Sequence, residues 1–210
     1  MKTLLQLSLT LIILITTRTV SVGQTVFETA STDDNFLIES WWVKPLDPEY
    51  KFTLFNLNTA EYNYELEEAI LMSYSIISYN AFKGFGPALG TRILPNKLVA
   101  LGGIQYTFYR EKFFVTANFT SEIKDKPDFE FFSIIQYRPK ITNKLKGFFQ
   151  GQFSFNFNSD IHLLSFQQLR LGADLGLAQT GLAVNQFQFG SNWDYDFQPG
   201  LFLRFEFNNL

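Results

Sequence analysis

Apolar and polar side chains alternate with a period of two along most of the chain. In 149–158 the odd positions carry Phe or Gly, and the even positions carry Gln, Ser or Asn. Segments 113–120, 169–177 and 201–208 show the same alternation. A period of two places successive side chains on opposite faces of a β-strand, whereas helical spacing would mix Phe with Gln and Arg on every face. The pattern therefore predicts strands, with the Glu-rich segment 60–71 left open as a short helix.

Ten segments carry this strand pattern, and turn-forming residues separate them. The segments are 49–58, 68–80, 84–93, 97–109, 112–123, 127–138, 146–157, 163–176, 180–190 and 199–208. A tilted strand needs about 9–11 residues to cross the hydrocarbon core of a bilayer. We therefore predict an all-β protein, a closed antiparallel up-and-down transmembrane β-barrel of ten strands over 48–210. Eight strands are the alternative, because the first three segments have the weakest pattern.

The start of the chain has the features of a secretory signal peptide over residues 1–23. A basic residue precedes an apolar run from Leu4 to Ile15, and Ser21-Val22-Gly23 is a small-x-small cleavage site. The run is shorter than the roughly 20 apolar residues of a membrane-spanning helix. We expect cleavage before Gln24 after export through the inner membrane. Residues 24–47 show no clear period, so we predict a periplasmic or plug-like segment there.

The aromatic content indicates which side of the barrel faces lipid. Phe accounts for 25 of 210 residues and aromatic residues for 18%, yet the mean hydropathy is +0.00. The narrow interior of a small barrel has no room for so many rings. On the outside of a soluble barrel they would form a large apolar patch in water. Lipid around the barrel removes both difficulties, so we predict an integral protein of the outer membrane of a Gram-negative cell.

The last predicted strand contains a motif that resembles the assembly signal of outer-membrane barrels, formed by Gln198, Gly200, Leu203 and Phe205. This resemblance implies contact with the barrel-assembly machinery during insertion, although the chain ends at Leu210 and not on an aromatic residue. In architecture the mature chain resembles small barrels of the outer-membrane protein A and W type. It is more similar to the uncharacterised barrels common in Gram-negative bacteria. The resemblance is one of pattern and implies no activity.

Charged residues in the polar set are predicted to point into the lumen. They are Asp128, Glu130, Arg138, Lys146, Arg170, Asp174, Arg204 and Glu206. Both signs occur in equal number, which favours ion pairs that close a narrow barrel. A selectivity constriction or a proton relay is the functional alternative, because charges at membrane depth are costly.

Two groups of residues are candidates for contact with another outer-membrane or periplasmic protein. Trp41 and Trp42 form the first group, because Trp is enriched at binding hot spots, with a membrane-interface anchor as the alternative. The second group comprises Gly84, Gly86, Gly102 and Gly103. Glycine in a strand marks a bulge, a tight bend or a surface on which another backbone packs closely.

Little in the sequence points to catalysis. The chain has no Cys, which excludes disulfides and thiol chemistry, and its formal net charge of −3 does not suggest nucleic-acid binding. The single histidine, His162, lies three residues before Ser165, a spacing that places the two side chains on opposite faces of a regular strand. We expect no cofactor and no metal. The favoured function is a structural or accessory subunit of a larger outer-membrane complex, for example in transport, secretion or assembly. A narrow channel or small hydrophobic-molecule conduit and a lipid-modifying enzyme are the alternatives.

Overall fold

The computed structural model describes residues 23–143 and 145–209, and its regular elements are strands. They are β1 (Gly23–Thr32), β2 (Asn35–Pro45), β3 (Phe52–Asn63), β4 (Glu68–Tyr79), β5 (Phe85–Leu94), β6 (Lys97–Arg110), β7 (Phe113–Glu122), β8 (Phe129–Tyr137), β9 (Lys146–Phe157), β10 (His162–Asp174), β11 (Ala178–Phe189) and β12 (Asp194–Asn209). Apart from Gly23, the expected signal peptide lies outside the described residues. Within the described ranges no helix is long and apolar enough to cross a membrane.

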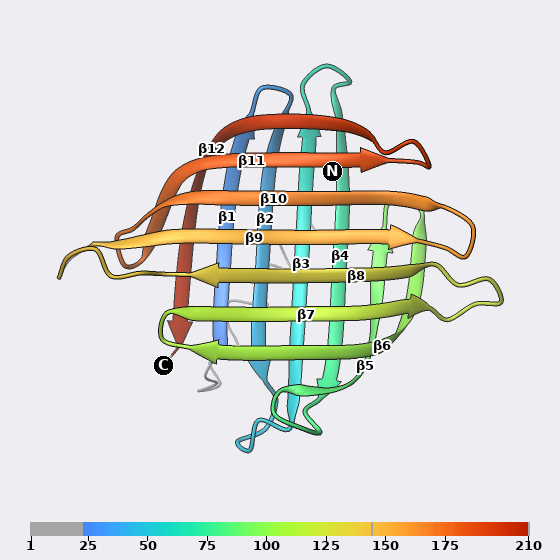
Figure 1. Ribbon diagram of the computed structural model, residues 1–210, viewed down its shortest axis with the longest axis horizontal. Helices are drawn as coiled ribbons and strands as arrows, with labels where there is room; N and C mark the ends of the chain where they lie inside the picture. Colours follow the sequence, from blue (N-terminus) through green and yellow to red (C-terminus); the bar gives the residue numbers. More distant parts are fainter. Residues whose placement is uncertain (1–22, 144, 210) are drawn as a thin grey trace, which may run out of the picture.

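Each strand pairs antiparallel with the strand that follows it, and β12 pairs with β1, so the sheet closes into a barrel. The barrel is flattened into two walls (Figure 1). Strands β1–β4 form the back wall, and β6–β11 form a front wall whose strands cross those of the back wall at a steep angle. Gly23 pairs with Asn209, which places both ends of the described chain at one rim. We call this end the terminal rim and the opposite end the far rim.

The strand count of ten, like the alternative of eight, is wrong, because the barrel has twelve strands. The ten predicted segments coincide with β3–β12. The two additional strands, β1 and β2, occupy the range 24–47 in which we expected a periplasmic or plug-like segment. The short helix considered for 60–71 is instead the end of β3, a turn and the start of β4.

Apolar inward positions explain why β1 and β2 gave no clear pattern. Val26 and Ala30 of β1 point inward and are buried, while Thr25 and Thr29 alternate with them on the outside. In β2 the fully buried Trp41 is followed directly by the outward Trp42. A lipid-facing barrel strand is expected to be polar inside and apolar outside. These strands depart from that rule, so a search for the usual alternation misses them.

Aromatic side chains from the two walls meet inside the barrel. Trp41 of β2 stacks on Phe114 of β7, with ring centroids 5.6 Å apart and planes 8° apart. Phe132 of β8 lies 5.7 Å from both Phe55 of β3 and Tyr74 of β4. All five side chains are at most 4% exposed. The front and back walls are therefore in direct contact through a buried aromatic cluster, which fills this part of the lumen.

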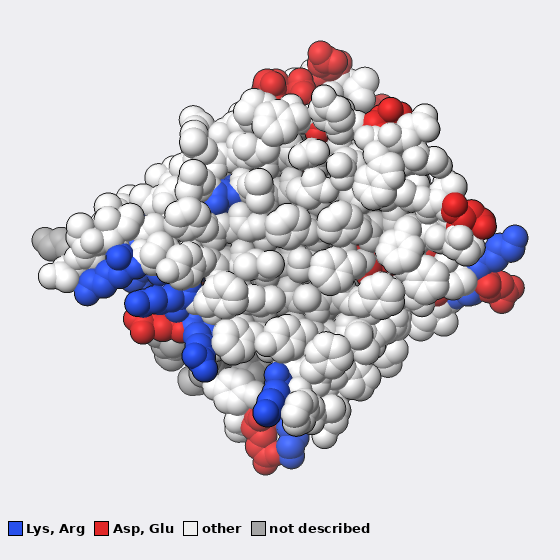
Figure 2. All heavy atoms as spheres, in the orientation of Figure 1, with Lys and Arg blue, Asp and Glu red and all other residues white. Residues whose placement is uncertain are grey.

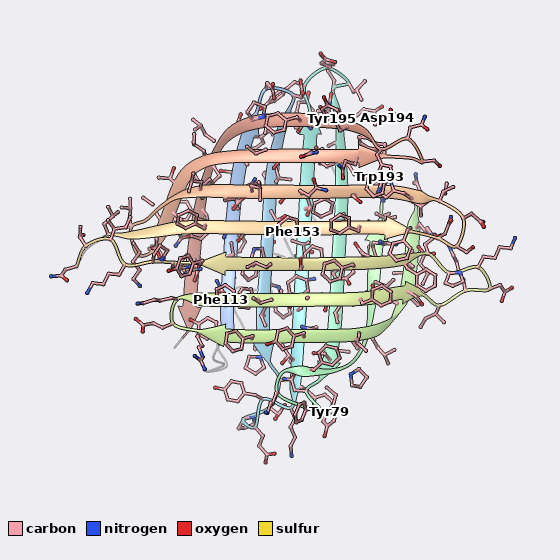
Figure 3. The ribbon with its side chains drawn as sticks, viewed as in Figure 1. Tyr79, Phe113, Phe153, Trp193, Asp194 and Tyr195 are labelled. Carbon is pink, nitrogen blue, oxygen red and sulfur yellow. The ribbon has the colours of Figure 1, made fainter. Side chains whose placement is uncertain are left out.

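The outer surface of the front wall is largely uncharged and mostly apolar, although Gln167, Gln186 and Gln188 also point outward. Figure 2 shows uncharged side chains across its middle, with charged side chains gathered mainly at the edges. Outward Phe residues occupy successive alternate positions of β9, including Phe153 at the centre of the view in Figure 3. Trp193 and Tyr195 lie at the far rim and are 48% and 75% exposed. An apolar band with aromatic residues at its border is typical of a lipid-facing barrel wall.

Glycines allow the tight strand approach at the bend between the walls. A Cβ atom at Gly86 of β5 would lie 1.7 Å from the carbonyl oxygen of Tyr79 in β4. A Cβ atom at Gly103 of β6 would lie 2.0 Å from the carbonyl oxygen of Phe119 in β7. Both distances are impossible for real side chains, so these positions accept only glycine without a shift of the backbone. Gly102, by contrast, faces outward, and its nearest neighbour would be 3.7 Å away.

We predict that Gly86→Ala destabilises the barrel by about 1–3 kcal/mol, the usual cost of overpacking, because its methyl group collides with backbone. Gly102→Ala in the adjacent strand is the matched control and should change stability by less than about 0.5 kcal/mol. The measurement is urea unfolding of the refolded proteins in vesicles, followed by Trp fluorescence. Equal stability of the two variants would contradict the assigned role of Gly86.

Candidate functional site

The candidate site is the lumen, where buried charges lie beside the aromatic cluster. At its centre Glu28 of β1 binds two arginines that are themselves fully buried. Its Oε1 accepts a hydrogen bond of 2.7 Å from Nε of Arg170 in β10, and its Oε2 accepts one of 2.8 Å from Nε of Arg204 in β12. A second bond runs from Nη2 of Arg204 to the same oxygen. One carboxylate thus links three strands across the lumen.

A chain of hydrogen bonds connects this centre to the terminal rim. Arg204 donates from Nη1 to Oε1 of Gln150 over 2.5 Å, and Gln136 donates to the same oxygen over 2.7 Å. Arg138 then donates to Oε1 of Gln136 over 2.8 Å and pairs with Glu206. Arg204 also lies 4.8 Å from the ring centroid of Phe148. These bonds join the front wall to β12, and the bond from Arg170 to Glu28 joins it to the back wall.

A second ion network lies toward the far rim. Arg92 of β5 donates to Glu122 of β7 over 3.0 Å and to Glu130 of β8 over 3.2 Å. Ser154 of β9 donates to the other oxygen of Glu130 over 2.9 Å. Lys97 also pairs with Glu122 over 3.1 Å. Positive and negative groups face each other directly here, so ion pairs join β5, β6, β7 and β8 at this end of the lumen.

The structure divides the eight predicted lumen charges into two groups. Glu130, Arg138, Arg170, Asp174, Arg204 and Glu206 point into the barrel. Asp128 lies just before β8 and pairs with Lys124, and Lys146 is exposed at the start of β9, so both belong to the rims.

Sequence reasoning missed Glu28, Glu39, Arg92 and Glu122. The first two lie in strands that were not recognised. Arg92 lies at the end of a Gly-rich segment, and Glu122 ends a strand whose polar face otherwise consists of Thr and Asn.

Several buried polar atoms in the lumen have no hydrogen-bond partner among the described residues. Both amide atoms of Asn118 are in this state, as are one oxygen of Glu39 and one of Gln152. The other Glu39 oxygen accepts a bond of 3.0 Å from Gln152. Buried polar groups in proteins are normally satisfied, and ordered water is the usual partner where no side chain is present. These atoms therefore mark the polar positions at which the lumen can hold isolated water molecules.

The residues proposed for partner contact have separate roles. Trp41 is fully buried in the lumen, so its assignment to a partner contact is wrong. Trp42 faces outward and is partly exposed. Gly84, Gly86 and Gly103 are each required by close approach to backbone of the same barrel, and Gly84 also has a φ of 88°. Gly102 alone among the four glycines leaves space on the outer face.

The assembly-signal residues lie in β12, the strand that closes the barrel against β1. Gln198 is buried and accepts a hydrogen bond of 3.0 Å from Asn35, whereas Leu203 and Phe205 face outward and are 43% and 40% exposed. A Cβ atom at Gly200 would lie 2.1 Å from the carbonyl oxygen of Ser31 in β1. All four residues thus belong to the closing strand.

His162 and Ser165 lie together despite their spacing. The pairing of β10 with β9 shifts register between His162 and Leu164, and this irregularity turns both side chains to the outer face. His162 Nε2 is 2.7 Å from Ser165 Oγ, and Nδ1 is 2.9 Å from the carbonyl oxygen of Gly190. The expectation that they lie on opposite faces is wrong for this reason. The Ser165 hydroxyl is fully buried, and in the described part of the chain the imidazole bonds to a backbone carbonyl and not to the carboxylate of a serine-hydrolase triad.

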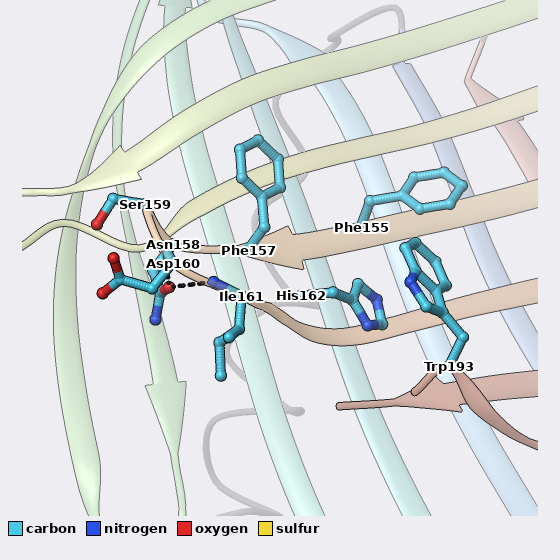
Figure 4. Close-up of a pocket in the computed structure, with 8 residues that line it drawn as sticks. All are labelled: Phe155, Phe157, Asn158, Ser159, Asp160, Ile161, His162 and Trp193. Carbon is cyan, nitrogen blue, oxygen red and sulfur yellow. Dashed lines mark hydrogen bonds between the residues drawn. The ribbon is translucent and has the colours of Figure 1, made fainter. Parts of the chain in front are cut away.

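A pocket of about 350 Å³ adjoins this pair at the far rim (Figure 4). It is lined by Phe155, Phe157, residues 158–161, His162 and Trp193. The imidazole of His162 stacks on the indole of Trp193 at 3.8 Å between ring centroids. Among the described residues no three His, Cys, Asp or Glu side chains gather closely enough to hold a metal ion.

The two rims differ in charge. Links at the terminal rim carry Lys51, Lys83, Lys112 and Lys140 together with the acids Asp47, Glu49 and Glu111. Links at the far rim are rich in acids, including Asp33, Asp34, Glu65, Glu67, Asp125 and Asp160. Figure 2 shows red side chains at the top, and blue and red side chains together at the left, bottom and right. The far rim is therefore acidic, whereas the terminal rim has a mixed charge.

Comparison with solved structures identifies the fold. One structure, from work on in-meso crystallization of membrane proteins, matches with a TM-score of 0.50 and 11% identity over 89% of this chain and 84% of that one. The fold is that of an outer-membrane β-barrel. An outer membrane channel from Pseudomonas putida F1 matches with a TM-score of 0.44 and 10% identity, covering 89% and 95% of the two chains. A bacterial polysaccharide outer membrane secretin matches with a TM-score of 0.36 and 9% identity, covering 90% and 98%. No family model and no curated protein matches the chain.

We predict that Glu28→Gln lowers the free energy of unfolding by about 3–5 kcal/mol, because it leaves two buried arginines without their carboxylate. Glu49→Gln is the control. Glu49 pairs with Lys51 in an exposed link, where ion pairs contribute at most about 1 kcal/mol. Unfolding in guanidinium, followed by Trp fluorescence in vesicles, measures both variants. A Glu28 variant as stable as the Glu49 variant would show that the central network does not hold the walls together.

Proposed function

We propose that this protein is an integral outer-membrane β-barrel with a structural or accessory role, acting as a subunit of a larger outer-membrane complex. It is exported with a cleaved signal peptide, and the terminal rim faces the periplasm. The observation that carries the proposal is the filled lumen. A barrel whose walls touch through Trp41, Phe114 and Phe132 leaves little space for a solute.

The short links between strands support the same role. The longest link runs from 138 to 145, and the links at the far rim run from two residues, 33–34, to six, 123–128. Long loops form the binding and lid regions of many proteins, and the links of this barrel are too short to form such regions. The outer wall and the two rims are then the surfaces left for recognition. The resemblance to barrels of the A and W type adds no activity to this argument.

A narrow conduit is the second candidate, and the unpartnered polar atoms of Asn118, Glu39 and Gln152 favour it, since isolated waters there would form part of a pathway. Open aqueous channels belong to barrels of 16 or more strands, and a twelve-stranded barrel conducts only if its interior is kept clear. The buried aromatic cluster and the ion networks weigh against this alternative.

We predict that the purified protein gives no conductance steps in a planar bilayer, and that Trp41→Ala combined with Phe114→Ala does. The double variant removes the stacked pair that joins the walls and opens space between them. Phe153→Ala combined with Phe155→Ala is the control, because these rings face lipid from β9. Stable conductance of the unaltered protein would favour the conduit over the accessory role.

We predict that tagged protein, extracted gently from its own outer membranes, co-purifies with a larger membrane or periplasmic protein in a fixed ratio. The lysines of the terminal-rim links are the expected contacts for acidic side chains of the partner. Replacement of Lys83, Lys112 and Lys140 by Glu should therefore release it, whereas Lys126→Glu at the far rim should not. Mass spectrometry of the eluate is the measurement. A barrel that elutes without any second protein would contradict the accessory role.

A further inference from the structure

Five polar side chains form a contiguous group on the outer face of the back wall. We call this group the mid-depth seam, and it consists of Ser40 of β2, Asn56 and Asn58 of β3, and Ser73 and Ser75 of β4. The register places Asn58 between Ser40 and Ser73, and Asn56 beside Ser75. In sequence these residues alternate with Trp41, Phe55, Leu57, Tyr74 and Ile76, which are buried in the lumen. The seam therefore faces away from the lumen.

The seam residues are joined by hydrogen bonds. Asn56 donates to Ser75 Oγ over 2.8 Å, and Asn58 donates to Asn56 Oδ1 over 2.6 Å. Ser73 donates to Asn58 Oδ1 over 2.8 Å, and a longer bond of 3.4 Å runs from Asn58 to Ser40. The bonds connect all five side chains across three strands. The five polar side chains therefore form a single hydrogen-bonded network on this wall.

The seam lies at the depth where lipid is least polar. Each of its residues is near the middle of its strand, so the seam is level with the centre of the membrane-spanning band. At the same depth on the front wall, the outward positions of β7, β8 and β9 are Ala117, Ser133 and Phe153, which lie side by side in the sheet. Polar side chains in hydrocarbon are costly even when partly satisfied, and in membrane proteins they commonly bind polar groups of a neighbouring chain.

We propose that the seam is the contact surface of a homodimer in the membrane, in which the back walls of two copies face each other. Two copies inserted in the same direction are related by an axis along the membrane normal. Such an axis preserves depth, so the seam of one copy necessarily meets the seam of the other. This proposal does not depend on the proposed accessory role.

The chemistry of the seam fits a second copy of itself. It contains no charge, and its amides and hydroxyls supply donors and acceptors in a self-complementary set. The hydroxyl hydrogens of Ser40 and Ser75 have no acceptor among the described residues, while the amide oxygens of Asn56 and Asn58 have a second lone pair each. Outward aliphatic side chains border the seam, among them Ile38, Leu71, Ile77 and Leu89, which are 42–61% exposed. A partner wall would bury this apolar border around a polar centre.

Cysteine cross-linking tests the proposal directly, because the chain contains no native Cys. Ser40→Cys, Ser73→Cys and Ser75→Cys are made singly and oxidised in intact outer membranes with copper phenanthroline. We expect at least one of them to give a covalent dimer of twice the chain mass. Ala117→Cys, a small outward residue in the middle of β7 on the front wall, is the control and should give only background dimer.

A second variant tests the role of the amides. Asn56→Leu with Asn58→Leu, placed in the best-linking cysteine background, should lower the dimer yield about ten-fold, the effect of two lost interchain hydrogen bonds of ordinary strength in a membrane. The leucines suit a lipid-facing strand, so the barrel should remain heat-modifiable on gels. Leu169→Ala with Leu171→Ala on β10 is the matched control and should leave the yield unchanged.

Three outcomes would overturn the proposal. They are background cross-linking at all three seam positions, an undiminished yield in the leucine variant, and an adduct whose mass contains a different protein. The last outcome would assign the seam to a heterologous partner and would agree with the accessory role. A seam dimer in membranes from which no larger protein co-purifies would instead retain this proposal and reject the accessory role.

Discussion

The need to fill the interior of a twelve-stranded sheet determines most features of this barrel. About eight strands enclose a space that side chains just fill, whereas barrels of 16 strands or more enclose water. Twelve strands in a round barrel would leave a lumen too wide for side chains to span. The chain instead flattens into two crossing walls, which brings Trp41 against Phe114 and Phe55 against Phe132. Contact between the two walls fills the interior, so this barrel has neither the narrow packed core of an eight-stranded barrel nor the open channel of a large one.

The other unusual features follow from this flattening. Two walls that cross steeply need sharp bends between them, and Gly86 and Gly103 lie where strand backbones approach too closely for any Cβ atom. Charges that lie between the walls cannot reach bulk water, so Glu28 binds both Arg170 and Arg204. A buried carboxylate with two guanidinium partners also fixes the positions of β1, β10 and β12 relative to one another. The ion network and the aromatic cluster thus both join the walls.

The sequence was informative where the strands obey the polar-inside rule and misleading where they do not. In β9, Phe alternates with Gln, Ser and Asn, so the strand and its lipid-facing side could both be predicted. The same alternation identified Arg170 and Arg204 as lumen residues. In β1 and β2 the inward positions mix apolar residues, among them Val, Ala, Leu and Trp, with polar ones, so no regular alternation appears. These strands, together with Glu28 and Glu39, therefore could not be found from the sequence.

Asn56 and Asn58 illustrate a second way in which sequence reasoning fails, because the strand is recognised but its two faces are assigned wrongly. Their alternation with Phe55 and Leu57 is plain in the sequence, but the rule that apolar residues face lipid would assign the amides to the lumen. Flattening reverses the assignment, because Phe55 and Leu57 are drawn inward to meet the front wall. The back wall consequently carries Asn56 and Asn58 on its outer face at mid-depth, joined to the serines of β2 and β4, while the rings that the usual rule would place in lipid pack inside the barrel. Contact between the walls therefore decides which face of a strand is polar, and the alternation along the strand does not decide it alone.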